Sequence, residues 1–184
     1  MNCLRVQIWI YMISILLFAI KGLGSFTGIR IGLASAKAMA EVYNIPIVSV
    51  SSLDSLAYNV EFNGNICSII DAKNNQVYMG LYDCNRKILS DYIADDINTC
   101  INIINKFNSN FMFVGDGSIV HKNLLATNFK SNSNFSTSNT LNAFAFSRCG
   151  LDKFNSGFVE NSDNVLPMYL RKSQAERMKD INGN

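Results

Sequence analysis

The chain has 184 residues, enough for one domain or two small lobes with a real core. Hydrophobic residues make up 48% and charged residues 16%, a balance that excludes an intrinsically disordered protein. The net charge of +2 is too small to indicate a nucleic-acid-binding surface. The five cysteines are widely spaced and lack a C-x-x-C pair, which favours reduced thiols over a disulfide framework or a zinc site.

The first part of the chain is almost wholly apolar from Ile8 to Ile20. This run is short for a membrane span. As a signal peptide it has only Arg5 before it, and Lys21 stands where small cleavage-site residues are expected. A buried strand that leads into the following glycine turn explains its second half. Three interpretations remain open: a strand, a membrane or signal segment, and a sequence artefact such as a shifted reading frame.

A glycine-punctuated turn and a long helix come next, from Gly22 to Tyr43. Apolar sequence before the turn and the strand-like IPIVSV after the helix predict a strand–helix–strand unit. Free N–H groups at a helix start can hold an anion. The residues concerned are Gly22, Gly24, Ser25, the expected N-cap, and Thr27. The alternative is that the glycines serve the geometry of the chain alone.

Small side chains recur every fourth residue along this helix, at Gly28, Gly32, Ala36 and Ala40. Such a row lets a second helix or a sheet approach the helix closely. Two interpretations stay open: the row packs on the chain's own sheet, or part of the helix is a partner surface. The residues predicted for that partner surface are Gly28, Ile29, Gly32, Leu33, Ala36, Ala40 and Tyr43.

Alternating apolar patterns predict the elements that follow. The expected strands are 47–50, a hairpin of 66–72 with 76–82, a strand around 88–93, and 111–114. One helix begins at Ser51 or Ser52, with Asp54 as a helix-capping carboxylate, and another begins at Asp95 and Asp96. Asp71 and Asp83 invite a reading as a catalytic carboxylate pair, but they stand at the far ends of the two hairpin strands.

A second glycine turn, Gly115-Asp116-Gly117, lies between the strand at 111–114 and a helix. This turn is a second candidate for anion binding. The alternative is that it only connects the strand to the helix. Beyond it the sequence predicts a loop at 129–139, a helix at 141–154 capped by Ser138 or Asn139, an extended segment at 162–170 and a basic, solvated tail.

Five blocks resemble the bacterial TsaB (YeaZ) family: GLGSFTGIRIGLASAKAMA, IPIVSVSSLDSLA, IIDAKNNQVYMGLYD, GDG and PMYLRKSQAE. They follow in order from about Ile13 to Glu176. The resemblance implies an α/β protein of the actin-like ASKHA (RNase H-like) fold. It also implies a cytoplasmic, non-catalytic partner of a larger paralogue, TsaD. That enzyme attaches threonylcarbamoyl to the adenosine beside the anticodon in a subset of tRNAs, with help from the ATPase TsaE.

The same resemblance brings out a departure from the family. TsaB-like chains open with a strand that carries an Asp-Thr-Ser turn, then two more strands and a helix, and Leu23 stands where they have proline. We therefore expect the fold to be incomplete at the N-terminus. The expected division is an atypical apolar segment at 1–12, a TsaB-like domain of the glycoprotease superfamily with two small lobes at 13–172, and a basic tail at 173–184.

Little in the sequence supports catalysis. His121 is the only histidine, so a site that needs a pair of metal-binding histidines cannot form, and His121 stands in no motif context that would indicate a Ser/His/Asp triad. We expect no catalytic residue, no metal ligand and no firmly bound cofactor, with ATP admitted only at a partner interface.

The predicted function is that of a scaffold for a TsaD-type paralogue. The further expected partners are a TsaE-type ATPase, a second copy of the chain, and tRNA indirectly. The alternative is a small ATP-binding phosphotransferase or ATPase of the actin-like fold. That function needs both glycine turns and an acidic residue on Mg²⁺, which the first strand of the fold usually provides.

Overall fold

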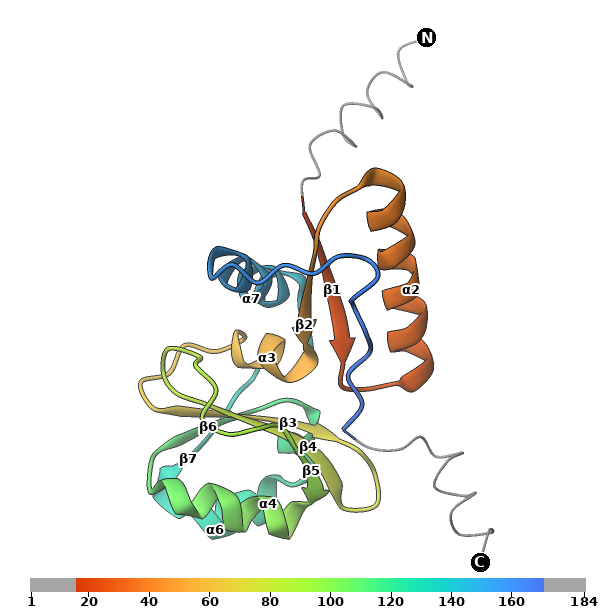
Figure 1. The fold of residues 1–184 in the computed structure, drawn as a ribbon. Helices are drawn as coiled ribbons and strands as arrows, with labels where there is room; N and C mark the ends of the chain where they lie inside the picture. Colours follow the sequence, from red (N-terminus) through yellow and green to blue (C-terminus); the bar gives the residue numbers. More distant parts are fainter. Residues whose placement is uncertain (1–15, 171–184) are drawn as a thin grey trace, which may run out of the picture.

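The computed structural model describes residues 16–170, which form two lobes with a short helix between them (Figure 1). The first lobe contains two strands and two helices: β1 (Leu17–Gly22), α2 (Phe26–Tyr43), β2 (Ile47–Ser51) and α7 (Ala143–Asn155). The helix between the lobes is α3 (Ser52–Ala57). The second lobe contains the remaining elements: β3 (Asn65–Asp71), β4 (Gln76–Tyr82), β5 (Ile93–Asp96), α4 (Ile97–Ile104), η1 (Asn105–Phe107), β6 (Phe111–Val114), α5 (Asp116–Val120), α6 (Lys122–Phe129), η2 (Lys130–Asn132) and β7 (Ser133–Phe135).

Some predicted segments fall outside the described residues. These are the N-terminal segment 1–12, the apolar run up to residue 15 and the basic tail 173–184. Residues 17–20 of the apolar run belong to β1, as the strand interpretation predicts for that part.

The predicted strand–helix–strand unit is confirmed in the first lobe. β1 and β2 run parallel with Leu17 opposite Ile47, and α2 connects them. Ser25 caps the helix, because its hydroxyl accepts a hydrogen bond from the Gly28 N–H. The helix ends at Asn44 in a left-handed conformation, with the Asn44 N–H donating back to the last turn. α2 covers one face of this small sheet and α7 covers the other (Figure 1).

The second lobe is built on a five-stranded sheet with the strand order β5-β4-β3-β6-β7. The predicted hairpin is confirmed as β3 and β4, which are antiparallel and joined by a turn in which Lys73, Asn74 and Asn75 all have positive φ. β6 runs parallel to β3, and β7 runs parallel to β6. The third strand lies later than predicted, at β5, and Ile88 makes only an isolated bridge to Tyr82.

Each face of the second sheet is covered by helices. α4 and α6 pack on one face, where Ile101 and Leu125 are buried against strand residues such as Met79. α3 packs on the opposite face through Leu56, which is buried with Ile66. α3 also contacts β2 and α7, so it belongs to the packing of both lobes.

The chain after α7 returns as an extended C-terminal strap, residues 158–170, along the first lobe (Figure 1). Glu160 pairs with Ile47 at the start of β2 through two main-chain hydrogen bonds. Val165 is fully buried in the core beneath α2. Tyr169 stacks on Phe26 at the start of α2, with 4.6 Å between the ring centroids. The strap therefore holds α2 at its first turn and along its inner side.

Two local predictions need correction. The loop expected at 129–139 contains β7, which adds to the sheet because its main chain pairs with β6. The last long helix is capped by Asn142 and not by Ser138 or Asn139, since the Asn142 side chain accepts from the Ala145 N–H. Asn139 instead binds the Gly115 N–H in the second lobe.

Candidate partner interface

α2 has three sides with different surroundings. Leu33, Ala36 and Ala40 are buried against the first sheet and Val165. A polar side is tied to the strap, where Lys37 Nζ donates to the Val165 carbonyl at 3.3 Å. The third side is exposed and uncharged, and we call it the α2 free face. It consists of Gly28, Ile31, Gly32, Ser35, Met39 and Val42.

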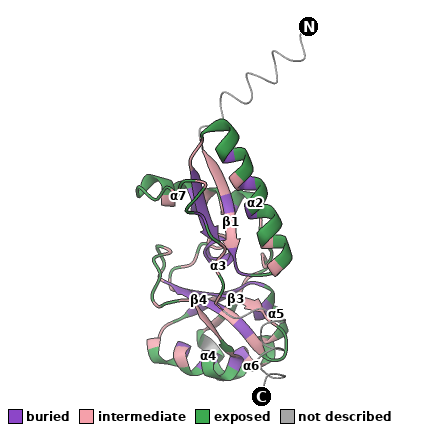
Figure 2. Cartoon of the chain, turned by 45° about the vertical axis from the view of Figure 1, so that its right-hand side comes forward, coloured by how far each residue is buried: buried purple, intermediate pink, exposed green. Residues whose placement is uncertain are grey.

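The α2 free face carries large apolar residues that are exposed, and Figure 2 shows much of α2 in the colour of exposed residues. Ile31, Met39 and Val42 are 63%, 48% and 76% exposed. Positions 28, 32, 35, 39 and 42 follow the alternating spacing of four and three that places residues in one row on a helix. At Gly32 an added Cβ would meet no atom within 4 Å. An exposed, uncharged row of small and apolar residues with open space at its glycine is typical of a docking surface for another helix.

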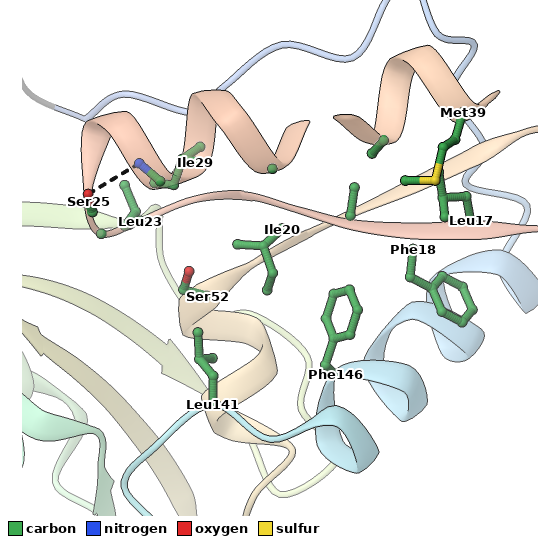
Figure 3. A pocket seen from close by; sticks show the side chains of 15 residues that line it. Leu17, Phe18, Ile20, Leu23, Ser25, Ile29, Met39, Ser52, Leu141 and Phe146 are labelled. Carbon is green, nitrogen blue, oxygen red and sulfur yellow. Dashed lines mark hydrogen bonds between the residues drawn. The ribbon is translucent and has the colours of Figure 1, made fainter. Parts of the chain in front are cut away.

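A groove continues from this face along β1 (Figure 3). Its volume is about 560 Å³, and α2 forms one wall while Phe146 of α7 stands on the other side of the strand. Its lining residues are Leu17, Phe18, Ala19, Ile20, Leu23, Gly24, Ser25, Gly28, Ile29, Gly32, Ala36, Met39, Ser52, Leu141 and Phe146. None of these residues is charged.

The structure divides the predicted interface residues between the core and the surface. Gly28 and Gly32 lie on the α2 free face, while Ile29 is half-buried at the groove and Tyr43 is 48% exposed at the end of the helix. Leu33, Ala36 and Ala40 pack on the chain's own sheet, because β1 and β2 need apolar cover on that side. The partner interface stays a prediction. Only the predicted residues outside the buried stripe, such as Gly28 and Gly32, are accessible to a partner.

The first glycine turn is shaped by the approach of the strap. Gly22 has a φ of +154°, and an added Cβ would lie 2.7 Å from the Met168 carbonyl oxygen. Gly24 has a φ of +153°, while Ser25 caps the helix and Thr27 is exposed. The Ser25 hydroxyl already binds the Gly28 N–H. The glycines thus have a geometric role, and anion binding at this turn stays a prediction.

The second glycine turn lies in the other lobe, against β3. Gly115 has a φ of +104°, and an added Cβ would lie 2.2 Å from the Ile69 carbonyl oxygen. The Gly115 N–H donates to Asn139 Oδ1 at 3.0 Å. The Asp116 carboxylate accepts from the N–H groups of Gly117 and Asp71. An anion would have to displace these side chains, and its binding here also stays a prediction.

Comparison with known proteins shows the family to which the chain belongs. The family model for TsaD, described as tRNA N6-adenosine threonylcarbamoyltransferase, matches residues 20–177. The chain belongs to the TsaD family. Its α/β architecture is accordingly the actin-like ASKHA fold, as predicted.

Within the TsaD family the chain is similar to TsaB, which confirms the predicted resemblance. TsaB of Bacillus subtilis, a tRNA threonylcarbamoyladenosine biosynthesis protein, is 37% identical over 109 residues, or 57% of this chain and 48% of the relative. TsaB of Haemophilus influenzae is 32% identical over 75 residues, or 39% of this chain and 31% of the relative. The chain therefore matches less than half of the length of these curated relatives.

Solved structures agree with this fold. A Pseudomonas aeruginosa protein described as similar to the peptidase YeaZ superposes with a TM-score of 0.69 at 18% identity, covering 91% of this chain and 81% of that one. A second structure, YeaZ from the same organism, superposes with a TM-score of 0.67 at 16% identity, covering 91% and 84%. At these identities the likeness is one of fold.

Asp71 and Asp83, which the sequence offered as a catalytic carboxylate pair, do not lie together. The hairpin register places Asp71 opposite Val77 and Tyr82 opposite Ile66, so Asp71 and Asp83 stand at opposite ends of the hairpin. Burial acts to raise the pKa of Asp71, but the hydrogen bonds and charge of Lys73 outweigh it and leave that pKa lowered. Within residues 16–170, no cluster of three or more His, Cys, Asp or Glu side chains is arranged to hold a metal ion.

Sequence reasoning missed a polar cluster around Asp54. This carboxylate is only 7% exposed. It accepts from the Tyr82 hydroxyl at 2.9 Å and the Tyr92 hydroxyl at 2.5 Å, and it pairs with Lys153 Nζ at 2.7 Å. The role predicted for Asp54 was helix capping, but Ser51 supplies the cap of α3. Burial and the Asp54 charge also raise the pKa of the nearby Cys149 thiol to about 12, so that thiol is protonated at neutral pH.

No helix in the described part of the chain is both long enough and apolar enough to cross a membrane.

Proposed function

We propose that this chain is an accessory partner of a TsaD-type paralogue in the threonylcarbamoyl modification of the adenosine next to the tRNA anticodon. The observation that carries the proposal is the α2 free face, an uncharged row with Ile31, Met39 and Val42 largely exposed on a family member. The TsaB relatives are named as biosynthesis proteins for the same modified nucleoside, which supports the pathway.

The proposed role is non-catalytic and cytoplasmic. A TsaE-type ATPase, a second copy of the chain and tRNA bound indirectly belong to the same proposal as further partners. ATP would bind only where a partner completes the site. The alternative, a small ATPase or phosphotransferase, has less support because side chains already bind the Gly115 and Gly117 N–H groups of the second turn.

The proposal is tested by binding of the purified chain to the TsaD-type paralogue of the same organism, measured by isothermal titration calorimetry. Val42→Asp should weaken the affinity by at least about tenfold, because it places a charge in a desolvated helix contact. Val120→Asp is the matched control, since Val120 is 60% exposed on α5 in the other lobe. Circular dichroism checks that both variants fold.

Unchanged binding of the folded Val42→Asp variant would exclude the α2 free face as the contact. In a second titration, ATP with Mg²⁺ should give no heat with the chain alone. Binding and hydrolysis of ATP by the isolated chain would favour the alternative function.

A further inference from the structure

A polar pocket with a volume of about 460 Å³ lies where α3, α7 and the loop between β4 and β5 meet. Asp54 and Tyr58 line it from α3, Cys149 and Lys153 line it from α7, and the loop contributes residues 85–88. Its walls therefore come from both lobes. Its volume is within the range of about 300–1,000 Å³ that is typical of sites for small molecules.

This pocket is separate from both glycine turns. Tyr82, which lines the pocket, pairs with the start of β3. The second glycine turn lies near the other end of that strand, where Gly115 approaches Ile69. The first turn lies near the same end, because Gly24 shares a small cavity with Tyr78, and Tyr78 pairs with the end of β3.

The carboxylates of the pocket already accept hydrogen bonds from neighbouring side chains. The Tyr82 and Tyr92 hydroxyls both donate to Asp54 Oδ1, and Lys153 Nζ lies 2.7 Å from Asp54 Oδ2. The Asp152 carboxylate accepts from the hydroxyl of the α3 tyrosine at 2.8 Å. A ligand that needs acceptors, such as a cation, therefore finds few of them here.

Hydrogen-bond donors remain available in the same pocket. Arg86 Nε is buried and has no hydrogen-bond partner in the described part of the chain, which is uncommon for a buried donor. Lys153 binds Asp54 with one of its three ammonium N–H groups, and the exposed Lys87 has no ion-pair partner within residues 16–170. Glu61 pairs with Arg86 at 2.6 Å, but its side chain is 70% exposed and it does not line the pocket.

We propose that this pocket binds a small organic anion, whose carboxylate or phosphate head accepts hydrogen bonds from Arg86, Lys87 and Lys153. Oxygen atoms of both head groups form strong, charge-assisted hydrogen bonds with such donors. The organic body packs against Ile88, which is 44% exposed, and against the ring of Tyr92.

Such a ligand contacts both lobes at once, because Lys87 belongs to the second lobe and Lys153 to the first. The inference goes beyond the proposed function: it concerns a small-molecule site on the isolated chain, and it needs neither the α2 free face nor a paralogue.

The experiment compares three probes that share one ring: benzoate, phenyl phosphate and the neutral benzamide. Each is titrated into the purified full chain, and binding is followed by two-dimensional NMR of the main-chain N–H groups. At about 1–10 mM, at least one of the two anions should shift the signals of residues 86–88 and 152–156. Benzamide should bind at least about threefold more weakly than that anion. The anion that binds more tightly identifies the head group as carboxylate or phosphate.

Two variants test the role of the charged side chains. Lys87→Gln and Lys153→Gln should each raise the dissociation constant of the bound anion by about threefold or more, because each removes a positive charge from the pocket. Lys106→Gln is the matched control, since Lys106 is an exposed lysine of the second lobe that does not line the pocket. The NMR spectrum of each variant shows whether it is folded.

The inference is wrong if neither anion shifts these signals at about 10 mM, or if benzamide binds as tightly as the anions. It is equally wrong if both folded lysine variants keep the affinity of the unaltered chain. All of these measurements are made without the TsaD-type paralogue, so their failure is distinguishable from a failure of the proposed function.

Discussion

Asp54 lies in the first turn of α3, where the helix dipole alone favours a carboxylate. The fold adds three partners from three other parts of the chain: Tyr82 on β4, Tyr92 before β5 and Lys153 on α7. Lys153 belongs to the first lobe and Tyr82 to the second, so this one carboxylate connects the two lobes. Burial together with the Asp54 charge raises the pKa of the Tyr82 hydroxyl well above its ordinary value, which keeps that hydroxyl a hydrogen-bond donor.

Replacing Asp54 by alanine should lower the free energy of unfolding by about 2–3 kcal/mol. The change leaves the buried Tyr82 hydroxyl without an acceptor and Lys153 without its counter-ion, although solvent reaches Lys153 and reduces the loss. Urea unfolding followed by circular dichroism gives the value. Asp163→Ala, at an exposed carboxylate, is the control. If both variants unfolded at the same urea concentration, the cluster would have no net stabilising role.

At the scale of elements, α2 covers its own sheet with one side and leaves its outer side exposed to solvent, where a partner can bind. The small side chains divide accordingly: Ala36 and Ala40 are buried in the core, while Gly28 and Gly32 are exposed. The row seen in the sequence is thus not one contact surface. Residues four apart are slightly rotated around the helix, so the row begins at the groove with Gly28 and Gly32 and ends in the core with Ala36 and Ala40.

Ala36→Trp should therefore act on the fold and not selectively on partner binding. Overpacking of a closed core costs about 1–3 kcal/mol or more. A thermal melt should show a clearly lowered Tm, whereas Ala38→Trp, at an exposed position of the same helix, should leave the Tm within a few degrees of the unaltered chain. A native Tm for Ala36→Trp would mean that the contact between α2 and the sheet is looser than the structure shows.

Local sequence patterns were sufficient to predict those elements whose start or turn is determined by neighbouring residues. Ser25 and the glycine turn predicted the start of α2, and the alternation around Asn74 predicted the β3–β4 hairpin. The exposed and buried sides of α2 could not be separated from sequence, because Gly, Ala and Ile are compatible with either environment. The Asp54 cluster was missed because its partners come from distant parts of the chain, and no local pattern connects Asp54 with Lys153.

At the scale of the whole molecule, the described residues contain separate cores in the two lobes. The core of the second lobe packs around Ile69 and Met79 in a sheet of five strands. The first lobe has two strands within the described range, and the far side of β2 is paired only at Ile47, by Glu160. The lobes should therefore differ in local stability.

Amide hydrogen exchange should reveal this difference. The amides of β3 are hydrogen-bonded within a strand that has neighbours on both sides, so they should exchange at least about tenfold more slowly than those of β2. Exchange measured by NMR at a single pH on the isolated chain is sufficient. Equal protection of β2 and β3 would indicate that the two lobes open together as one unit.

The C-terminal strap has a consequence for how this protein forms during synthesis. Val165 completes the core under α2, and Glu160 pairs with the start of β2, yet both leave the ribosome after nearly all of the rest of the described chain. The second lobe has all of its strands by Phe135. The order of completion is therefore the reverse of the usual N-terminal-first order of domain folding: the half made first must wait for the residues made last. In that interval α2 and its sheet lack the side chains that close their core, so the apolar residues that Val165 covers stay exposed to solvent.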